Sequence, residues 1–358
     1  MRGTADARRP VHRAIAPVKI LVLKPSSLGD VVQALPVARL LKRRFPAAEL
    51  HWWLNSELVP LLGNDPDIDR VVPFDRKSWG SPFGWPGAIG SIRDLRRERY
   101  DWVIDLQGLA RSSAVAWLAA GALTIGLDDP REAAPVAYDV SVPRAGHNVH
   151  AVDWYLSVLR RLDVPVTWDF EWMPRDEGAA AAIRSLWPDD GLRWIAFQPG
   201  ARWTNKRWPA ENFAALAARL TAQDPSLRVV VLGGDADRPL GGQIAAAAPG
   251  RCLDLTGQLS LPGMVEWLRR CAMMVTNDTG PMHIAAALNK PVVAMFGPTR
   301  PRQTGPYGQI QQVLQLALPC VPCMKNSCKL ATPMECLRGL SVARVQAEVD
   351  ARWNSAGS

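Results

Sequence analysis

The sequence lacks any apolar stretch that is long enough to cross a membrane. Its longest uncharged run, residues 112–127, falls short of the roughly 20 residues of a transmembrane helix and is interrupted by Gly121, so we expect a buried helix and a strand there. The first seventeen residues are basic and contain prolines, but they lack the apolar core of a signal peptide. We therefore expect a disordered or tag-like leader over residues 1–17 and a cytoplasmic protein.

Several nucleotide-binding motifs are also missing. Neither G-x-x-x-x-G-K-[ST] nor G-x-G-x-x-G occurs, which argues against a P-loop kinase and against a dinucleotide-dependent dehydrogenase. No motif of a nucleic-acid reader and no strongly basic, aromatic-rich strand is present, so we expect no nucleic-acid partner. The formal charge of +8 then points to phosphorylated small molecules or to an anionic lipid surface.

What the sequence does contain is a rhythm of short apolar runs and helical segments that occurs twice. At 358 residues the chain is natural for two domains of roughly 150 to 200 residues each. The alternation predicts an α/β protein with two Rossmann-like, doubly wound parallel sheets that face each other across a ligand cleft. We place the first domain at residues 18–165, a linker rich in Pro, Asp and Trp at 166–192, the second domain at 193–340 and a closing helix at 341–358.

The loop after the first strand reads KPSSLGD and leads into a helix. Ser26 and Ser27 suit a helix cap, Gly29 allows a tight turn, and Asp30 falls in the first helical turn. Asp30 then has two possible roles. It either complements the helix dipole or acts as a general base at the carboxyl end of the strand.

Two loops of the second domain carry charged residues after predicted strands. In QPGARWTNKRWP, Lys206 and Arg207 can neutralise phosphate oxygens, although loop cations are usually just solvated. In LGGDADR, Asp235 and Asp237 can accept hydrogen bonds from ribose hydroxyls, or they belong to a solvated turn.

The segment NDTGPMH places an acid, a hydroxyl, a glycine and an imidazole at one predicted helix start. These residues are Asp278, Thr279, Gly280 and His283, and they follow an apolar strand. A helix N-terminus offers unpaired N–H groups and a positive dipole to an anion. A lone histidine is more often structural, but this combination favours a site for a phosphate-bearing ligand.

Four of the six cysteines form the pattern C-x2-C-x4-C-x7-C, at Cys320, Cys323, Cys328 and Cys336. In a reducing compartment this spacing predicts a structural zinc site, or less readily an iron–sulfur cluster. A set of reduced cysteines in a loop explains the pattern equally well. Neither metal would be needed for the chemistry of the helix-terminus site.

Together these stretches resemble glycosyltransferase family nine, the ADP-heptose:lipopolysaccharide heptosyltransferases, over residues 18–349. KPSSLGDVVQALP is similar to the family's N-terminal signature, and VIDLQGLARSS to its acceptor-side motif. NKRWP is similar to its phosphate-binding lysine segment, and NDTGPMHIAAALNKPVVAMFGPT to its donor signature. DDPREAAPVAYD is most similar to the first heptosyltransferase of the inner core.

The resemblance implies a GT-B fold and inverting sugar transfer without a catalytic metal or other required cofactor. It implies that Asp30 is the general base and that Lys206 stabilises the leaving diphosphate. Asp105, which also ends a strand, is the reserve candidate for the base, although support of the following turn is the better explanation for it.

The resemblance also divides the binding roles between the two domains. The second domain would hold a nucleotide-diphosphate sugar through Asp278, Thr279, Gly280 and His283, with Asp235 on the ribose and Asp237 as the alternative. Ser27, Gln107 and Arg111 of the first domain would meet a lipid-linked core oligosaccharide.

The acceptor places the enzyme at the inner leaflet of the cytoplasmic membrane as a peripheral protein. The residues before Lys206 depart from the family, since Ala201, Arg202 and Trp203 stand where hydroxyl residues are common. Two alternatives therefore remain open, namely a different NDP-sugar donor or glycan acceptor, and a protein that binds a nucleotide sugar without catalysis.

Overall fold

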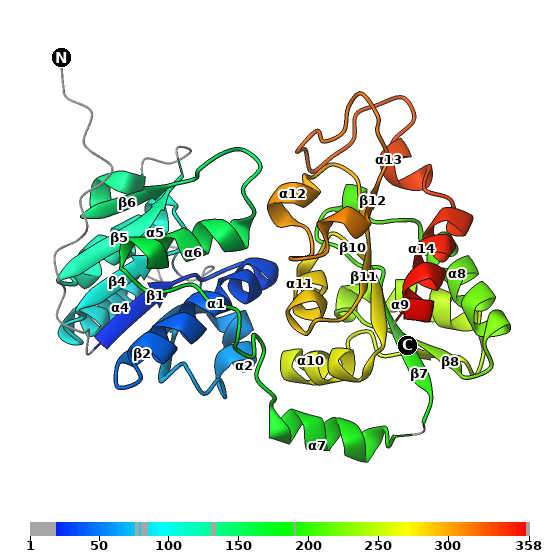
Figure 1. The fold of residues 1–358 in the computed structure, drawn as a ribbon, viewed down its shortest axis with the longest axis horizontal. Coiled ribbons are helices and arrows are strands. Elements are labelled where there is room, and N and C mark those ends of the chain that lie inside the picture. The colour runs from blue at the N-terminus through cyan, green and yellow to red at the C-terminus, as the bar shows by residue number, and fades with distance from the viewer. Residues whose placement is uncertain (1–18, 76–78, 80–84, 130–133, 190, 356–358) are drawn as a thin grey trace. The chain divides into compact units, whose positions relative to one another are not determined.

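The computed structural model describes residues 19–75, 79, 85–129, 134–189 and 191–355. The predicted leader over residues 1–17 lies outside this part of the chain. The chain divides into two compact units, Met1–Pro174 and Arg175–Ser358 (Figure 1). The division falls inside the segment 166–192 that we interpret as a linker.

The first unit is built on a parallel sheet of six strands in the order β3-β2-β1-β4-β5-β6. The strands are β1 (Lys19–Leu23), β2 (Glu49–Asn55), β3 (Arg70–Phe74), β4 (Trp102–Asp105), β5 (Leu123–Asp128) and β6 (Val140–Pro143). The helical elements are α1 (Leu28–Arg44), η1 (Ser56–Leu58), α2 (Val59–Leu62), α4 (Trp85–Arg97), α5 (Ala110–Ala119), η3 (Ala134–Ala137) and α6 (Ala151–Arg161). The central strands are continuously apolar because helices cover both faces of a parallel sheet.

The second unit repeats this arrangement with the order β12-β11-β10-β7-β8-β9. Its strands are β7 (Arg193–Gln198), β8 (Leu227–Val231), β9 (Cys252–Asp254), β10 (Met273–Asn277), β11 (Val292–Phe296) and β12 (Val313–Gln315). Its longer helices are α7 (Glu177–Leu186), α8 (Ala210–Gln223), α9 (Arg238–Ala246), α10 (Leu261–Arg270), α11 (Gly280–Ala287) and α14 (Val342–Ser355). The short ones are η4 (Thr204–Lys206), η5 (Asp235–Asp237), α12 (Pro301–Thr304), η6 (Ile310–Gln312) and α13 (Glu335–Arg338).

The closing helix α14 is part of the second unit rather than a separate element. Its Val345 and Val349 are buried in the same core as Ile195 and Val275 of the sheet. Each unit is thus a parallel sheet with helices on both faces. The predicted pair of Rossmann-like domains is confirmed.

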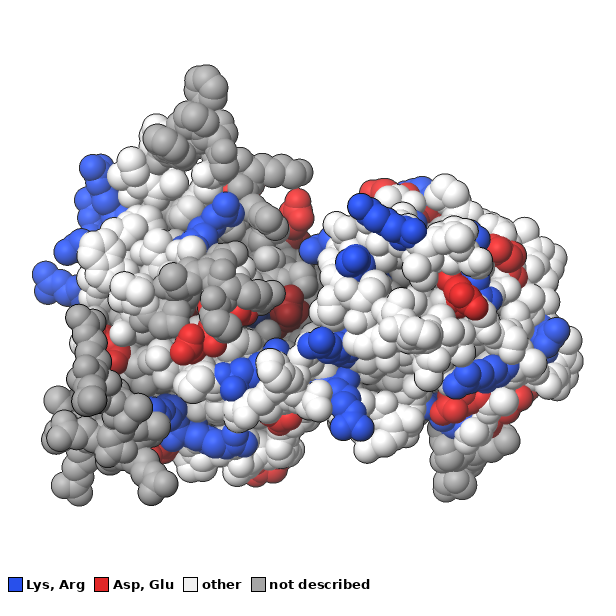
Figure 2. Space-filling view, turned by 90° about the horizontal axis from the view of Figure 1, so that it is seen from above, with Lys and Arg blue, Asp and Glu red and all other residues white. Residues whose placement is uncertain are grey.

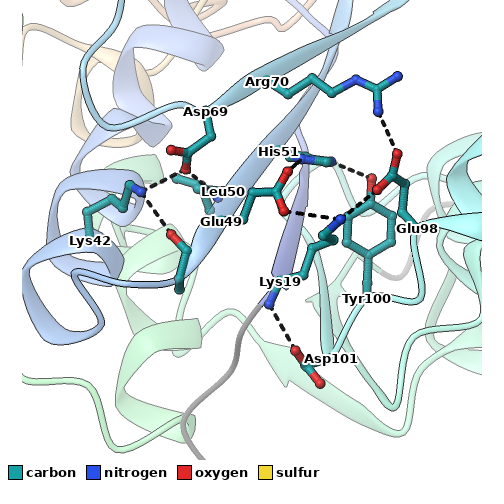
Figure 3. A network of polar contacts seen from close by, with 11 residues as sticks. Lys19, Lys42, Glu49, Leu50, His51, Asp69, Arg70, Glu98, Tyr100 and Asp101 are labelled. Atoms are coloured by element: carbon teal, nitrogen blue, oxygen red, sulfur yellow. Dashed lines mark hydrogen bonds and ion pairs between the residues drawn. The ribbon is translucent and has the colours of Figure 1, made fainter.

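A network of charged residues joins the amino ends of four strands of the first sheet (Figure 3). Lys19, at the start of β1, contacts Glu49 at 3.1 Å and Glu98 at 2.7 Å. The buried His51 ring lies 2.7 Å from a Glu49 carboxylate oxygen and 2.8 Å from the Tyr100 hydroxyl. This network links the strands at their amino ends, opposite to the loops that follow their carboxyl ends.

We expect Glu98→Gln to lower the free energy of unfolding at pH 7 by about 1 kcal/mol, because the network is partly exposed. A hydrogen bond from Lys19 holds the pKa of Glu98 below its usual value, and one from His51 does the same for Glu49. A carboxyl group with a depressed folded pKa stabilises the fold above its unfolded pKa, and this stability is lost as the pH falls through the folded value. The difference between variant and wild type should therefore shrink below about pH 4.

Urea titrations at several pH values between 7 and 3.5 measure this difference. Asp94→Asn is the matched control, because its ion pair with Arg97 spans 3.3 Å between two largely exposed side chains. The control should change the free energy of unfolding by no more than about 0.5 kcal/mol. An equal loss in Glu98→Gln at every pH would contradict the electrostatic explanation.

Candidate functional site

The strand order reverses once in each sheet, and in open α/β sheets ligands bind beside such a reversal. In the first sheet it lies between β1 and β4, and in the second between β7 and β10. The helices that follow such a strand pair leave toward opposite faces of the sheet, which exposes loop backbone at the carboxyl ends of the strands. Most of the predicted site residues follow one of these four strands.

In the first unit, Ser27 and Asp30 lie together at the start of α1. The Ser27 backbone N–H and hydroxyl both donate to the same Asp30 carboxylate oxygen, at 3.0 and 2.6 Å. Both side chains are half-buried. These bonds fix the direction of the Asp30 carboxylate at the carboxyl end of β1.

Lys24, which the sequence analysis does not single out, lies beside the candidate site. Its side chain is only 4% exposed, its ammonium donates to the Leu106 carbonyl at 3.0 Å, and it lies 4.7 Å from the centre of the Tyr155 ring. Burial opposes the charge, but Tyr155 and Asp30 favour it, and the pKa of Lys24 stays above its usual value. A permanent cation therefore lies beneath the loop that carries Asp30.

Asp105 supports the turn after β4. It is fully buried and accepts hydrogen bonds from the Gln107 and Gly108 backbone N–H groups at 2.8 and 3.2 Å, and from the Tyr138 hydroxyl at 2.7 Å. Burial raises the pKa of Asp105, against the effect of these hydrogen bonds. The geometry thus gives Asp105 a structural role in the turn.

The two acceptor-side residues of that turn differ in exposure. Arg111 is exposed in the first turn of α5. The Gln107 side-chain oxygen is buried and has no hydrogen-bond partner within the described part of the chain. A buried amide oxygen that lacks a donor is suited to a ligand hydroxyl.

In the second unit, Lys206 and Asp278 meet although 72 residues separate them. The Lys206 ammonium lies 2.6 Å from an Asp278 carboxylate oxygen, which also accepts the Thr299 hydroxyl at 2.6 Å. The ammonium is 4.8 Å from the centre of the Trp203 ring. Three loops, after β7, β10 and β11, therefore meet at one Asp278 carboxylate oxygen.

Asn277, the last residue of β10, holds this arrangement in place. Its amide oxygen accepts the Trp208 backbone N–H at 2.9 Å, and its amide nitrogen donates to the Pro199 carbonyl at 2.7 Å. Both partners flank the loop that carries Lys206. Asn277 therefore ties that loop to the end of β10.

Thr279, Gly280 and His283 surround the start of α11 as predicted from the sequence. Thr279 is the N-cap in extended conformation, Gly280 is the first helical residue, and His283 is buried one turn further along. The N-terminus of α11 lies directly after Asp278. The helix dipole and the Lys206 ammonium thus act on the same region of the second unit.

Asp235 and Asp237 point to different surroundings. The Asp235 side chain is 83% exposed and pairs with Arg238 at 2.9 Å. Asp237 is 14% exposed, accepts the Gly234 backbone N–H at 3.1 Å, and packs so closely on Gly200 that any side chain there would collide with it. Asp237 thus braces the loops after β7 and β8, whereas the Asp235 carboxylate stays accessible.

The structure does not support the predicted metal site at the four cysteines. Cys320, Cys323, Cys328 and Cys336 are free thiols, and no group of three or more His, Cys, Asp or Glu side chains in the described ranges is arranged to hold a metal ion. The thiols have unequal surroundings. Cys328 already accepts the Met334 backbone N–H at 3.3 Å, and burial raises the pKa of Cys336.

The family model of glycosyltransferase family 9 (heptosyltransferase) matches residues 90–333. This range includes β4 and β10, which lie at the two reversals of strand order, and the Lys206–Asp278 pair. The chain belongs to this family. It is therefore a glycosyltransferase, and the sequence resemblance is confirmed.

Relatives of both inner-core types match over most of their length. Lipopolysaccharide heptosyltransferase 1 of Pseudomonas aeruginosa is 31% identical, over 87% of this chain and 87% of its own. Lipopolysaccharide heptosyltransferase 2 of Escherichia coli is 30% identical, over 84% of this chain and 88% of its own. These identities do not separate the two types, and part of the type-1 segment, residues 130–133, lies outside the described residues.

Solved structures of the family share the fold of this family member. The ADP-heptose heptosyltransferase II of Escherichia coli has a TM-score of 0.76 at 25% identity, and covers 95% of this chain and 100% of its own. Escherichia coli heptosyltransferase WaaC with ADP has a TM-score of 0.75 at 25% identity, over 93% and 99%.

We expect Lys24→Met to lower the free energy of unfolding by about 2 kcal/mol, because the Leu106 carbonyl loses a charged donor. Thermal or urea unfolding at pH 7 measures the change. Lys329→Met removes the same charge from an exposed side chain and should change the value by less than about 0.5 kcal/mol. Equal stability of the two variants would show that the buried ammonium does not hold the loop.

Proposed function

We propose that this glycosyltransferase transfers a heptose from ADP-heptose to the Kdo/heptose region of the lipopolysaccharide inner core, with inversion and without a catalytic metal. The observation that carries the proposal is the Lys206–Asp278–Thr299 cluster beside the start of α11. It offers cationic and helix-terminal groups to a diphosphate. The relatives' names supply the sugar and the acceptor.

Lys206 is the group that stabilises the leaving diphosphate in this proposal. Its ammonium has three N–H donors, and one of them is directed to Asp278. The remaining donors are available to diphosphate oxygens, whose negative charge grows as the bond to the sugar breaks. Asp278 and Thr299 then orient Lys206, and Thr279, Gly280 and His283 bind phosphate or sugar oxygens.

We further propose that the nucleotide of the donor is ADP and that a loop of the second unit binds its ribose. Escherichia coli WaaC was solved with ADP, and this chain shares its fold over nearly its whole length. Asp235 is the ribose ligand we propose, because its carboxylate is exposed at the loop after β8.

Asp30 is the proposed general base on the acceptor. Its carboxylate takes the proton of the acceptor hydroxyl while that oxygen attacks the anomeric carbon and the bond to the diphosphate breaks. A single displacement inverts the anomeric centre, so no second carboxylate has to act as nucleophile. Lys24 is a positioning residue, because it holds a positive charge beneath the Asp30 loop.

Gln107 and Arg111 are the proposed acceptor ligands, together with Ser27. The unpartnered Gln107 oxygen suits a sugar hydroxyl, and the exposed Arg111 suits an anionic group of the acceptor. Ser27 contributes through its bonds to Asp30.

Calorimetric titration with ADP, UDP, GDP and dTDP in EDTA tests the donor. We expect selective binding of ADP, and about 10- to 100-fold weaker binding in Lys206→Ala, because a hydrogen bond from a charged donor is lost. Lys329→Ala, an exposed lysine, is the control and should bind as wild type does. Preference for another nucleotide would overturn the donor, and no binding at all would favour a different function.

Asp30→Asn separates chemistry from donor binding in the same experiment. It should bind ADP as wild type does but lose sugar transfer by a factor of about 100 or more. Full transfer activity in this variant would exclude Asp30 as the base.

Peripheral contact with an anionic membrane is the partner proposal for the first unit. Among the described residues, no helix combines the length and apolar character of a membrane span. The face shown in Figure 2 mixes both signs of charge. Helices α4 and α5 and the turn η3 pack side by side and expose three large apolar side chains, Ile89, Trp117 and Val136.

Exposed cations accompany these apolar residues. Arg93, Arg96 and Arg97 follow Ile89 on α4 at spacings of four, seven and eight residues, which places them along one side of the helix. Amphipathic surfaces of this kind bind bilayers through buried apolar area and attraction to anionic headgroups.

Flotation with vesicles that contain phosphatidylglycerol tests this contact. Replacing Arg93, Arg96 and Arg97 together with Gln should weaken partitioning about 100-fold, at about 1 kcal/mol per charge near the surface. Arg219 and Arg344, exposed on the second unit, provide a control substitution. A wild-type chain without affinity for these vesicles would contradict the proposal.

A further inference from the structure

A pocket of about 190 Å³ lies between α7 and α10 of the second unit, and four arginines line it. Arg175 and Arg184 come from the α7 side, and Arg269 and Arg270 are the last residues of α10. The pocket also contains two carboxylates, Asp189 and Glu266, and a floor of two apolar side chains. Among the described lining residues, arginines therefore outnumber carboxylates.

The two carboxylates already have donors from the protein. Glu266 is 3% exposed and accepts Arg269 Nε at 3.2 Å and the Asp176 backbone N–H at 3.3 Å. Asp189 accepts the Gly191 backbone N–H at 3.1 Å. Each carboxylate therefore has a hydrogen-bond donor other than Arg175 and Arg184.

Arg175 and Arg184 have donors that the described part of the chain does not use. Arg175 Nε lies 3.7 Å from a Glu266 oxygen and 3.8 Å from a Glu177 oxygen, and Arg184 Nη2 lies 4.0 Å from the other Glu177 oxygen. These are ion-pair distances that leave the guanidinium N–H groups beyond hydrogen-bond distance of the carboxylates. Two planar guanidinium groups thus border the pocket with their N–H groups available. Such groups match the oxygens of phosphate in paired hydrogen bonds.

Hydrogen bonds between the ends of α7 and α10 fix the positions of the two walls of the pocket. Arg270 donates to the Trp187 carbonyl at 2.5 Å and to the Pro188 carbonyl at 3.1 Å, which ties the end of α7 to the end of α10. Its guanidinium also lies 4.8 Å from the centre of the Trp267 ring. A ligand would therefore enter a site that is largely formed beforehand.

We propose that this pocket binds a phosphate-class oxyanion through Arg175 and Arg184. The site is distinct from the one we propose for the donor. Helix α10 leads into β10, so Arg269 lies near the amino end of that strand, whereas Lys206 and Asp278 lie at the carboxyl ends. The bound anion fastens α7, the first helix of the second unit, to the body of that unit (Figure 1).

Titration of the full chain with orthophosphate and with pyrophosphate, in a Lys206→Ala background, tests this site. That background weakens the proposed diphosphate site, and chloride keeps the ionic strength constant. We expect saturable binding of one anion per chain that falls at least 10-fold when Arg175 and Arg184 are both replaced by Gln. Acetate, which lacks the phosphate geometry, should bind at least 10-fold more weakly than orthophosphate.

The double replacement Arg219→Gln with Arg344→Gln is the matched control. It removes the same charge from exposed positions of the same unit and should leave anion binding unchanged. Unaltered binding in the Arg175/Arg184 variant, or an equal loss in both variants, would overturn the proposal, and so would the absence of saturable binding. If the double variant fails to fold, Arg184→Gln alone decides the same question.

A 19F spectrum of fluorotryptophan-labelled protein locates the anion. Trp187 and Trp267 both contact Arg270, and their resonances should shift on saturation while that of Trp117 stays in place. Shifts confined to other tryptophans would place the anion elsewhere and overturn the assignment.

Discussion

Parallel pairing of β1 with β4 and of β7 with β10 is the constraint on which the candidate site depends. It brings the carboxyl ends of strands that are far apart in the sequence to one edge of each sheet. Lys24 and the Asp105 turn meet there in the first unit, and Lys206 and Asp278 meet there in the second. Without this pairing the charged groups would be isolated loop residues.

Neighbouring polar and charged groups, rather than exposure to water, stabilise the lysine charges near these loops. Lys24 stays charged while buried because Asp30 and Tyr155 oppose the cost of burial. The Lys206 ammonium and the Thr299 hydroxyl both donate to the same Asp278 oxygen. The Thr299 bond orients the Asp278 carboxylate, and the carboxylate in turn positions the ammonium. The Lys24 ammonium is therefore enclosed by the protein, whereas the Lys206 ammonium is partly exposed beside the start of α11.

The sequence allowed the two sheets to be predicted because buried parallel strands are continuous apolar runs, as KILVL in β1 and VVAMF in β11 show. It also allowed Lys206 and Asp278 to be placed after strands of the second unit. Their mutual contact, and the parts of Asn277 and Thr299, depend on loops 20 to 80 residues apart, which no local pattern reveals. The spacing of the four cysteines predicted a metal site, but within the described residues the side chains are not arranged to hold a metal ion.

The network around His51 lies at the amino ends of the strands, and the candidate site lies at the opposite ends. The contacts that link the amino ends of β1, β2, β3 and β4 are therefore separate from the candidate site at the carboxyl ends. A substitution in the loops at the carboxyl ends can therefore alter the candidate site and leave the contacts of this network in place.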